Sequence, residues 1–327
     1  WSSDVCSSDL RRALDLFLIV GLTINSMKKI FLLSFAIVSC CITLKAQNGI
    51  VVFQTDFGTK DGAVSAMKGV ASAVDASLKL YDLTQDIPAY NIWEAAYRLD
   101  QTVPYWPAGT VFVSVVDPGV GTNRKSVVVK TKTGHFIVTP DNGTLTLIAA
   151  SLGIDSIREI DETTNRRKNS EASYTFHGRD VYAFTAARLA SHTIRFEQVG
   201  KISTSPITLL SFQKAQLVGQ MLQGTIDILD IQYGNIWTNI DQENWKKFNT
   251  LSHTKNEMLV QIFKEHKLVY TGKMPFENTF GGVAIGKPLA YLNSLMNLSF
   301  ALNQDNFSEK FHIYAGSHWS VKVQWVK

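Results

Sequence analysis

Residues 110–124 of this 327-residue chain read TVFVSVVDPGVGTNR. The segment from Thr110 to Val116 is mostly apolar and β-branched, a pattern typical of a strand that is buried on both faces. It stops at Asp117-Pro118-Gly119, a combination that favours a tight turn. Strands buried on both faces occur mainly where helices cover a sheet, so this stretch indicates an α/β domain.

The residues on either side repeat this alternation of strand and helix. Short apolar runs predict strands at 50–53, 78–81, 126–130 and 135–138. Helical spacing predicts helices at 63–74, at 93–102, from about residue 144, and at 181–190. We therefore expect residues 47–200 to form an α/β domain with a central, largely parallel sheet covered by helices.

The pattern changes after Gly200, where helical periodicity fades. Short or alternating apolar runs predict strands at 224–231, 258–263, 267–270, 298–302 and 320–326. Pro206 and several serines and threonines indicate a linker over 201–214. We expect residues 215–327 to form a smaller, all-β, barrel-like domain.

Residues 27–46 have the pattern of a secretory signal. Met27-Lys28-Lys29 precedes an apolar run, 30–44, that is shorter than the ~20 residues needed to span a bilayer. Cleavage after Ala46 predicts an exported protein, periplasmic or extracellular. A lipoprotein is the competing interpretation, because residues 37–40 resemble a lipobox with Cys40 as the acylated residue. Only in that case do we expect contact with a membrane.

Residues 1–26 precede this signal and are set aside. They open with WSSDVCSSDL, which resembles translated adapter sequence, so we treat them as a non-native leader. The alternative is a genuine extension that is anchored by its own apolar stretch, residues 16–24.

The composition excludes several classes of function. All three cysteines lie within residues 1–46, so the remainder has no disulfide, no thiolate nucleophile and no cysteine-ligated metal. The formal net charge of +4 falls to +2 over residues 47–327, which carry 27 basic and 25 acidic residues. Nucleic-acid binding needs a clustered basic face, so we expect no nucleic-acid partner.

Acidic residues follow several of the predicted strands, namely Asp56, Asp82, Asp117 and Asp141. In open α/β sheets, ligands bind in the crevice outside the carboxyl ends of the strands. Aspartate also starts turns and caps helices, and we expect that chemistry to account for about half of these residues.

The loop after Thr110–Val116 carries the first candidate for chemistry. Two glycines permit a ligand to approach the backbone, and Asp117 and Arg124 lie seven positions apart, within reach of each other. By itself this signal is weak, because Asp-Pro-Gly is a frequent turn and Arg124 could be a solvated surface residue.

A second candidate is the segment 174–180, which leads into the predicted helix at 181–190. His177 is the type of side chain best suited to take a proton near neutral pH, although a lone histidine more often fills a polar niche. We expect Asp180 to cap the helix, with Arg179 as its partner.

A third candidate is the segment 227–239 in the β-rich domain. Asparagine can bond the edge of a base as both donor and acceptor, and tyrosine and tryptophan offer faces for stacking, as an adenine ring requires. The alternative is a simple β-turn at Tyr233-Gly234-Asn235, with Trp237 in the core.

Together these segments resemble the S-adenosylmethionine (SAM) hydroxide adenosyltransferase family, the SAM hydrolases. The resemblance is carried by Thr55-Asp56-Phe57-Gly58 with Asp61, the Asp117–Thr122 loop with Arg124, Pro140-Asp141-Asn142-Gly143, and Phe176-His177-Gly178-Arg179-Asp180. The Tyr-Gly-Asn segment, Asn293-Ser294 and Asn303-Gln304 are similar to the family's C-terminal domain. The resemblance covers residues 49–327, with the motifs in the family's order.

The resemblance implies an enzyme that splits SAM with water into adenosine and methionine, with SAM as substrate and neither cofactor nor metal. The family's catalytic triad matches Asp117, Arg124 and His177. Its substrate-binding positions match Asp56 at the ribose, Asp230 at the methionine ammonium, and Tyr233, Asn235, Trp237 and Ser294 around the adenine. It also implies a homotrimer, with each site between the N-terminal domain of one subunit and the C-terminal domain of the next.

Fluorinase and chlorinase share this fold but use a halide in place of water. They carry tyrosine at the position of Asp117 and lack a histidine at that of His177; the fluorinase also has threonine for Val120 and serine for Gly178. The sequence is therefore similar to the water-using branch. Three alternatives stay open: a halide-using relative, an exported protein that binds adenosine-type ligands without turnover, and a structural α/β protein.

Overall fold

The computed structural model describes residues 48–251 and 256–326. The expectations for the leader at 1–26, the signal peptide at 27–46 and a lipidated Cys40 fall outside the described residues. Within the described ranges, no helix is both long enough and apolar enough to cross a membrane.

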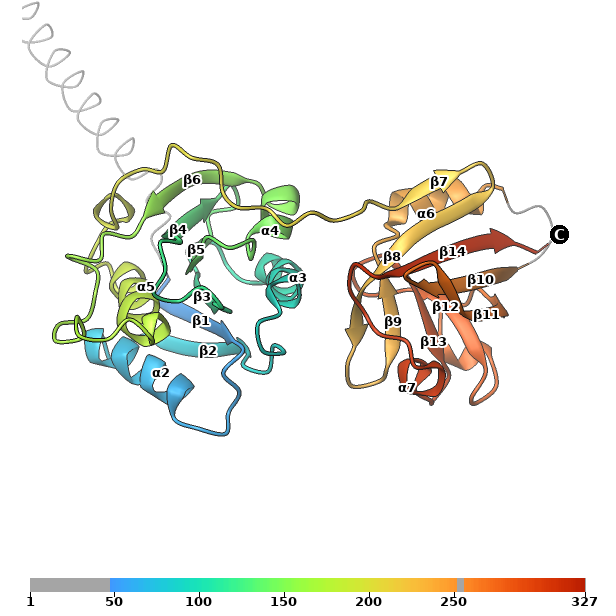
Figure 1. Cartoon of the computed structure of the whole chain (residues 1–327), viewed down its shortest axis with the longest axis horizontal. Coiled ribbons are helices and arrows are strands. Elements are labelled where there is room, and N and C mark those ends of the chain that lie inside the picture. The colour runs from blue at the N-terminus through green and yellow to red at the C-terminus, as the bar shows by residue number, and fades with distance from the viewer. Residues whose placement is uncertain (1–47, 252–255, 327) are drawn as a thin grey trace, which may run out of the picture. The chain divides into compact units, whose positions relative to one another are not determined.

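A six-stranded sheet forms the centre of the N-terminal domain, in the order β2-β1-β3-β5-β4-β6 (Figure 1). The strands are β1 (Ile50–Thr55), β2 (Lys79–Thr84), β3 (Val111–Val115), β4 (Ser126–Thr131), β5 (Phe136–Pro140) and β6 (Ile154–Glu159). Neighbours are parallel from β2 to β5, whereas β4 runs antiparallel to both β5 and β6. The predicted largely parallel sheet is confirmed, and β6 is a strand that the sequence analysis did not predict.

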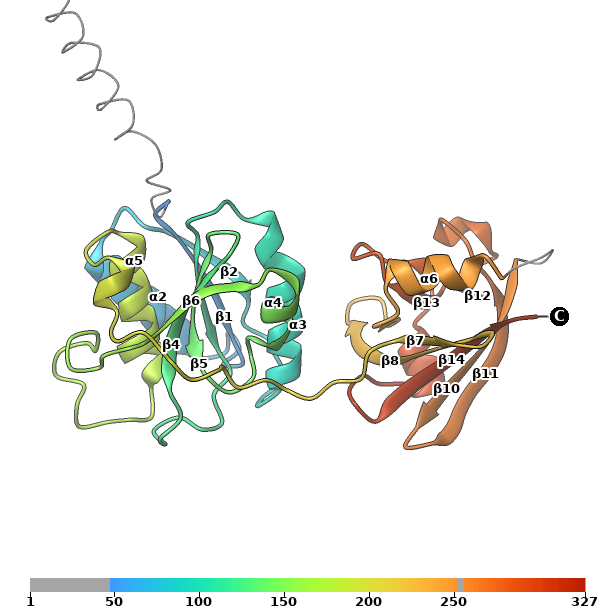
Figure 2. The same ribbon diagram turned by 90° about the horizontal axis from the view of Figure 1, so that it is seen from above.

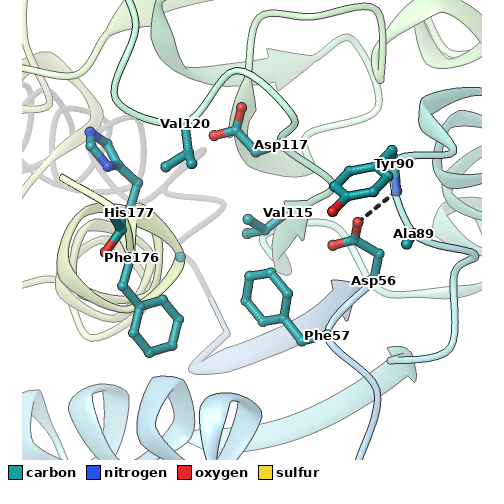
Figure 3. A pocket seen from close by; sticks show the side chains of 11 residues that line it. Asp56, Phe57, Ala89, Tyr90, Val115, Asp117, Val120, Phe176 and His177 are labelled. Carbon is teal, nitrogen blue, oxygen red and sulfur yellow. Dashed lines mark hydrogen bonds between the residues drawn. The ribbon is translucent and has the colours of Figure 1, made fainter.

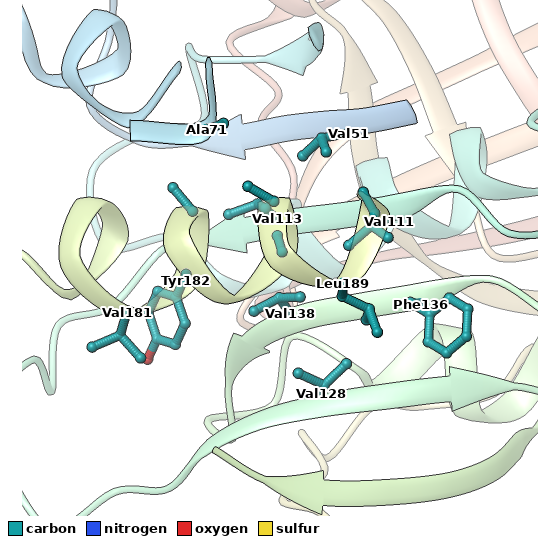
Figure 4. Close-up of a cluster of buried hydrophobic side chains, with 14 of the residues drawn as sticks. Val51, Ala71, Val111, Val113, Val128, Phe136, Val138, Val181, Tyr182 and Leu189 are labelled. Atoms are coloured by element: carbon teal, nitrogen blue, oxygen red, sulfur yellow. The ribbon is translucent and has the colours of Figure 1, made fainter. Parts of the chain in front are cut away.

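Helices cover both faces of this sheet (Figures 1 and 2). They are α2 (Ala63–Val74) and α5 (Phe184–Ala190) on one face, and α3 (Ile92–Thr102) and α4 (Thr146–Ser151) on the other. Successive residues of β1 serve the two faces in turn, because side chains alternate along a strand. Val51 and Phe53 pack in the cluster that contains α2 and α5 (Figure 4), and Val52 packs in the cluster of α3 and α4. This explains why β1 is apolar without interruption from Ile50 to Phe53.

Two of these helices begin beside the candidate site. Asn91 caps α3, since its side chain accepts a hydrogen bond of 3.1 Å from the backbone N–H of Glu94. The predicted helix at 181–190 begins earlier, with a π-helical turn, η2 (Gly178–Ala183), that runs into α5. π-Helical turns are rare and often occur at functional sites.

The expectation that Asp180 caps this helix is wrong. Asp180 lies inside η2 and is fully buried, and its carboxylate receives two hydrogen bonds of 2.8 Å from Arg179. Arg167 contacts the same carboxylate at 3.5 Å. Arg179 is therefore the expected partner, in an ion pair instead of a cap.

The C-terminal domain is an antiparallel sheet that curls into a half-barrel, with eight strands (Figure 1). In chain order they are β7 (Gln216–Val218), β8 (Met221–Asp230), β9 (Asn235–Thr238), β10 (Glu257–Lys264), β11 (Lys267–Pro275), β12 (Pro288–Leu292), β13 (Leu298–Leu302) and β14 (Trp319–Trp325). The predicted all-β, barrel-like class is confirmed. Two short helices, α6 (Gln242–Asn249) and α7 (Phe307–Phe311), accompany the sheet and were not predicted.

Candidate active site

Asp117 and Arg124 form a nearly buried ion pair at the carboxyl end of β3. Arg124 Nε donates to Asp117 Oδ1 at 2.8 Å, and Nη2 donates to Oδ2, so the two planar groups meet edge to edge. The side chain of Asp117 is only 5% exposed, and that of Arg124 is only 12% exposed. Nη1 of Arg124 donates to Ser126 Oγ at 3.0 Å, which fixes the guanidinium from a third direction. Such two-pronged, charge-assisted bonds are stronger and more directional than single neutral ones.

The loop between these two residues is folded tightly enough to make the pair. The N–H of Val120 donates to the carbonyl of Asp117, and that of Thr122 donates to Gly119. Gly121 has φ +77°, and a Cβ there would lie 3.1 Å from the carbonyl oxygen of Tyr174. Only glycine allows this backbone conformation together with this close approach, which brings the loop against the segment that carries His177.

His177 stands just before η2 and is 5% exposed. Burial lowers its pKa below the ordinary value of 6.5, and the charges of Arg124 and Arg166 lower it further, while Glu162 and Asp117 oppose them. The imidazole is therefore neutral at neutral pH, the form that can accept a proton.

Asp117, His177 and Asp56 all line one pocket of about 240 Å³. Figure 3 shows Asp56 and Tyr90 on one side of the pocket and Phe176 and His177 on the other. Most of the wall is apolar, with a few charged groups converging on it, as is usual in ligand sites. The volume is below the ~300–1,000 Å³ that is typical of pockets for whole ligands, so this pocket fits part of a larger molecule.

Asp56 holds Tyr90, a residue with an unusual backbone conformation, at the pocket wall. One carboxylate oxygen of Asp56 accepts a hydrogen bond of 2.9 Å from the backbone N–H of Tyr90 (Figure 3). Tyr90 has φ +69°, a left-handed conformation that is uncommon for an aromatic residue, and its side chain is 73% exposed. The other carboxylate oxygen of Asp56 stays available to a ligand.

Gly178 sits where even the smallest side chain would be tightly packed. A Cβ at this position would lie 3.2 Å from Phe57 and 3.3 Å from the sulfur of Met67. The glycine thus lets η2 approach α2 and the loop after β1 closely, which sets the position of His177.

The remaining predicted site residues lie in the C-terminal domain, and none of them lines this pocket. Asp230 and Asn235 flank the turn between β8 and β9, and Asn235 Nδ2 donates to Asp230 Oδ2 at 3.0 Å. Tyr233 in this turn is 66% exposed. Trp237 is buried, with its Nε1 donating to the hydroxyl of Tyr291 at 3.1 Å. Ser294 is exposed, on the turn that follows β12.

Two of the four strand-end aspartates serve the fold instead of the pocket. Asp82 lies within β2, where it pairs with Lys68 and accepts a hydrogen bond from Gln85. Asp141 accepts a hydrogen bond of 2.8 Å from the backbone N–H of Thr208. Only Asp56 and Asp117 of the four reach the pocket, so the expectation of a ligand edge holds for half of them.

The groups that surround His177 were not predicted from the sequence. Glu162 Oε2 lies 3.6 Å from His177 Nε2 and 2.7 Å from Arg166 Nη1. Tyr182, fully buried, faces Ser126 Oγ at 3.2 Å and lies under the guanidinium of Arg124. The four-residue spacing of Glu162 and Arg166 was the only signal in the sequence, and it does not indicate what the pair faces.

Comparison with known sequences decides the family. Residues 51–200 match the profile of the SAM hydroxide adenosyltransferase N-terminal domain, and residues 224–320 match that of the C-terminal domain. The chain belongs to the SAM hydroxide adenosyltransferase family. The first profile ends at Gly200 and the second begins within β8, so each profile falls within one of the two domains of this family member.

Some of the relatives are named as hydrolases of SAM and others as fluorinases. An (R)-S-adenosyl-L-methionine hydrolase of Salinispora tropica is 30% identical, over 83% of this chain and 97% of that protein. The enzyme of that name from Methanocaldococcus jannaschii is 43% identical over 43% of this chain, a match that spans about half (52%) of its own length. A fluorinase of Actinoplanes sp. is 26% identical over 82% of this chain and 96% of that protein.

A solved structure supports the fold. An uncharacterized conserved protein from Thermotoga maritima, 32% identical, superposes with a TM-score of 0.75 over 84% of this chain and all of that one. This family member therefore shares its two-domain architecture with a chain whose fold is known from a crystal.

Proposed function

We propose that this protein hydrolyses SAM to adenosine and methionine by attack of water on C5′ of the ribose. The observation that carries the proposal is the nearly buried Asp117, paired with Arg124, on the wall of the same pocket as a neutral His177. Asp117 offers a fixed carboxylate that can orient a water molecule, and His177 offers a base. Family membership supplies the substrate class, because relatives over most of the chain are named SAM hydrolase or fluorinase.

The reaction needs one positioned water and no acid. The water oxygen forms a bond to C5′ while the C5′–sulfur bond breaks. The electron pair of the broken bond stays on sulfur, so the sulfonium becomes the uncharged thioether of methionine. The proton lost by the water passes to the pair formed by Asp117 and His177. Arg124 keeps the Asp117 carboxylate in one orientation, so that the water lies in line with the breaking bond.

Asp56 is the proposed anchor for the ribose. Its carboxylate lines the same pocket, with one oxygen occupied by the N–H of Tyr90. The other oxygen can accept hydrogen bonds from sugar hydroxyls, which would place C5′ between Asp56 and Asp117. A volume of about 240 Å³ suits the ribose and the attacking water, but not the adenine and methionine as well.

We further propose that the rest of SAM is bound by the C-terminal domain of a second copy, in a homotrimer. The five candidate residues of that domain are Asp230, Tyr233, Asn235, Trp237 and Ser294. The exposed ring of Tyr233 and the paired Asp230 and Asn235 supply a stacking face, a carboxylate and an amide within one β8–β9 turn. These are the groups that an adenine and an ammonium require.

A halide is disfavoured as the nucleophile by charge. A carboxylate at the nucleophile position repels an anion but accepts a hydrogen bond from water. Arg124 balances the charge of Asp117, so this pair contributes no net positive charge that would attract a halide.

Incubation of the purified protein with SAM tests the proposal, with products separated by liquid chromatography beside a His177→Ala variant. We expect adenosine and methionine in equal amounts, and a loss of roughly 100-fold or more in the variant, which is the usual contribution of a general base. Binding of SAM without any adenosine would contradict hydrolysis and favour a ligand-binding protein.

A further inference from the structure

The side chain of His177 is surrounded by groups that belong to three parts of the N-terminal domain. Glu162 and Arg166 come from the loop after β6, Asp117 and Arg124 come from the loop after β3, and Tyr182 lies within η2. Of these, Glu162 is the acid nearest to the ring, with Oε2 at 3.6 Å from Nε2. Glu162 does not line the pocket, so it can act on the reaction only through its neighbours, of which His177 lines the pocket.

Glu162 is itself held in place from two sides. Arg166 donates to its Oε2 at 2.7 Å, and the hydroxyl of Ser126 lies 3.5 Å from its Oε1. Arg166 is buried, donates to the carbonyl of Ser173 at 2.8 Å, and lies over the ring of Tyr174. Ser126 also receives the hydrogen bond from Arg124, so one hydroxyl links the carboxylate of Glu162 to the Asp117–Arg124 pair.

The two ring nitrogens of His177 have different surroundings. Nε2 faces the Glu162 carboxylate, which can only accept a hydrogen bond. Nδ1 is buried and has no hydrogen-bond partner among the described residues. A proton on Nδ1 would turn the Nε2 lone pair toward a carboxylate, which is repulsive, and would leave a buried donor unpaired as well. A proton on Nε2 avoids the repulsion, and it leaves a lone pair on Nδ1 that has no partner among the described residues.

We propose that Glu162 is a positioning residue for His177: it holds the ring proton on Nε2 and leaves Nδ1 as the nitrogen that accepts the proton of the attacking water. The kinetic part of this inference rests on the proposed function, whereas the tautomer and the electrostatic coupling do not. The negative charge of Glu162 stabilises the imidazolium and so raises the pKa of His177 against the effect of burial. It thereby makes His177 a stronger base than the buried ring would be alone.

The test uses three variants. Glu162→Gln removes the charge at nearly constant shape, and Glu162→Asp keeps the charge on a shorter side chain. Glu171→Gln is the matched control, because Glu171 is an exposed acid of the same loop for which no side-chain hydrogen bond or ion pair occurs among the described residues. Nitrogen-15 NMR of the histidine rings gives the tautomer and the titration of His177, which is assigned by the signal that a His177→Gln variant lacks.

We expect the unmodified protein to show the Nε2–H tautomer. In Glu162→Gln the titration of His177 moves to lower pH, and kcat for SAM falls roughly tenfold, because the base is weaker, with a smaller change in KM. The acid limb of the pH profile moves to lower pH with it. Glu162→Asp changes the His177 titration and kcat less than Glu162→Gln does, and Glu171→Gln leaves both quantities unchanged.

Two results would overturn the inference. One is an Nδ1–H tautomer in the unmodified protein. The other is a Glu162→Gln variant whose His177 titration does not move, whatever happens to its rate, because a loss of rate alone would then reflect only loop structure. If the protein fails to hydrolyse SAM but Glu162→Gln still shifts the titration, the proposed function fails while the coupling of Glu162 to His177 stands.

Discussion

Arg124 meets the carboxylate of Asp117 with two donors, and the pair is almost entirely out of solvent. A buried ion pair of this kind adds little to stability compared with an apolar pair, because the desolvation of both charges offsets their attraction. The pair has a more direct role in the site, because its carboxylate lies on the pocket wall together with a neutral histidine. The pair presents one rigid carboxylate to the pocket, and several consequences of that arrangement can be measured.

Arg124→Lys should keep the charge but lose the two-pronged contact. A lysine ammonium is a point charge and cannot hold both oxygens of Asp117 in a fixed plane. We expect kcat to fall roughly 100-fold, similar to the loss of one positioned donor in other active sites, with a smaller effect on KM. Arg167→Lys, a more exposed contact to Asp180 outside the pocket, serves as the control and should leave kcat unchanged. Equal losses in the two variants would argue against a specific role for the Arg124 geometry.

The rate should depend on the protonation of His177. The base must be neutral, and burial lowers the pKa of His177 below 6.5. Activity should therefore persist to a pH below 6.5 and fall only as the pH drops through the lowered pKa. A pH profile of kcat/KM measures this, and the acid limb should be absent from the residual activity of His177→Ala. An acid limb above 6.5 would contradict the assignment.

Gly178→Ala should disturb the position of η2. The added methyl group would lie 3.2–3.3 Å from Phe57 and Met67 in a packed core, so we expect a loss of about 1–3 kcal/mol in the free energy of unfolding. Activity should also fall, because His177 moves with η2. The control is Gly69→Ala on α2, where a Cβ meets nothing within 4 Å. That change should stabilise the protein by about 0.5–1 kcal/mol, and denaturant unfolding compares the two. If both substitutions change the free energy of unfolding by the same amount, the packing at Gly178 is not tight.

Asp227→Asn should stabilise the folded protein at neutral pH. Burial raises the pKa of Asp227 to about 6, above the value of 3.8 for a free side chain, while a hydrogen bond from Thr225 opposes the shift. The folded state therefore binds this proton more tightly than the unfolded state does. The contribution of this group to stability is fully present below about pH 4 and is lost as the pH rises through 6.

The asparagine does not ionise and can still accept from Thr225, so we expect a gain of about 2 kcal/mol at pH 7 that disappears near pH 4. Thermal unfolding at the two pH values measures it. Asp155→Asn, at an exposed position, should change stability by less than about 0.5 kcal/mol at either pH. A gain in Asp227→Asn that is the same at pH 4 and pH 7 would show that ionisation is not its cause.

Regular elements with strong patterns could be predicted from the sequence. The helix at 63–74 has the predicted bounds, because small and apolar residues repeat on one face, and β1 and β3 are runs of apolar residues that serve both faces of the sheet. The strand at 154–159 was missed because only two of its six residues, Ile154 and Ile157, are apolar, and it lies at an edge of the sheet. The helix at 242–249 was missed because only Trp245 and Phe248 of its eight residues are buried.

The candidate site could be predicted only in part, for the same reason. Asp117 and Arg124 share a loop of defined turn chemistry, so their contact follows from local sequence. The approach of Glu162 to His177 depends on how the loop after β6 packs against η2, and no local pattern encodes it. The π-helical turn at 178–183 and the left-handed Tyr90 are likewise consequences of tertiary packing, which overrides the local preference of the chain.

The origin of the new oxygen in the product tests the proposed hydrolysis most directly. The protein is incubated with SAM in water enriched in oxygen-18, with sodium chloride present, and the nucleoside products are analysed by mass spectrometry. Attack of water at C5′ predicts adenosine that carries one oxygen-18 atom at the 5′ hydroxyl, with an equal amount of unlabelled methionine. A 5′-chloro-5′-deoxyadenosine product, or no conversion of SAM, would contradict it.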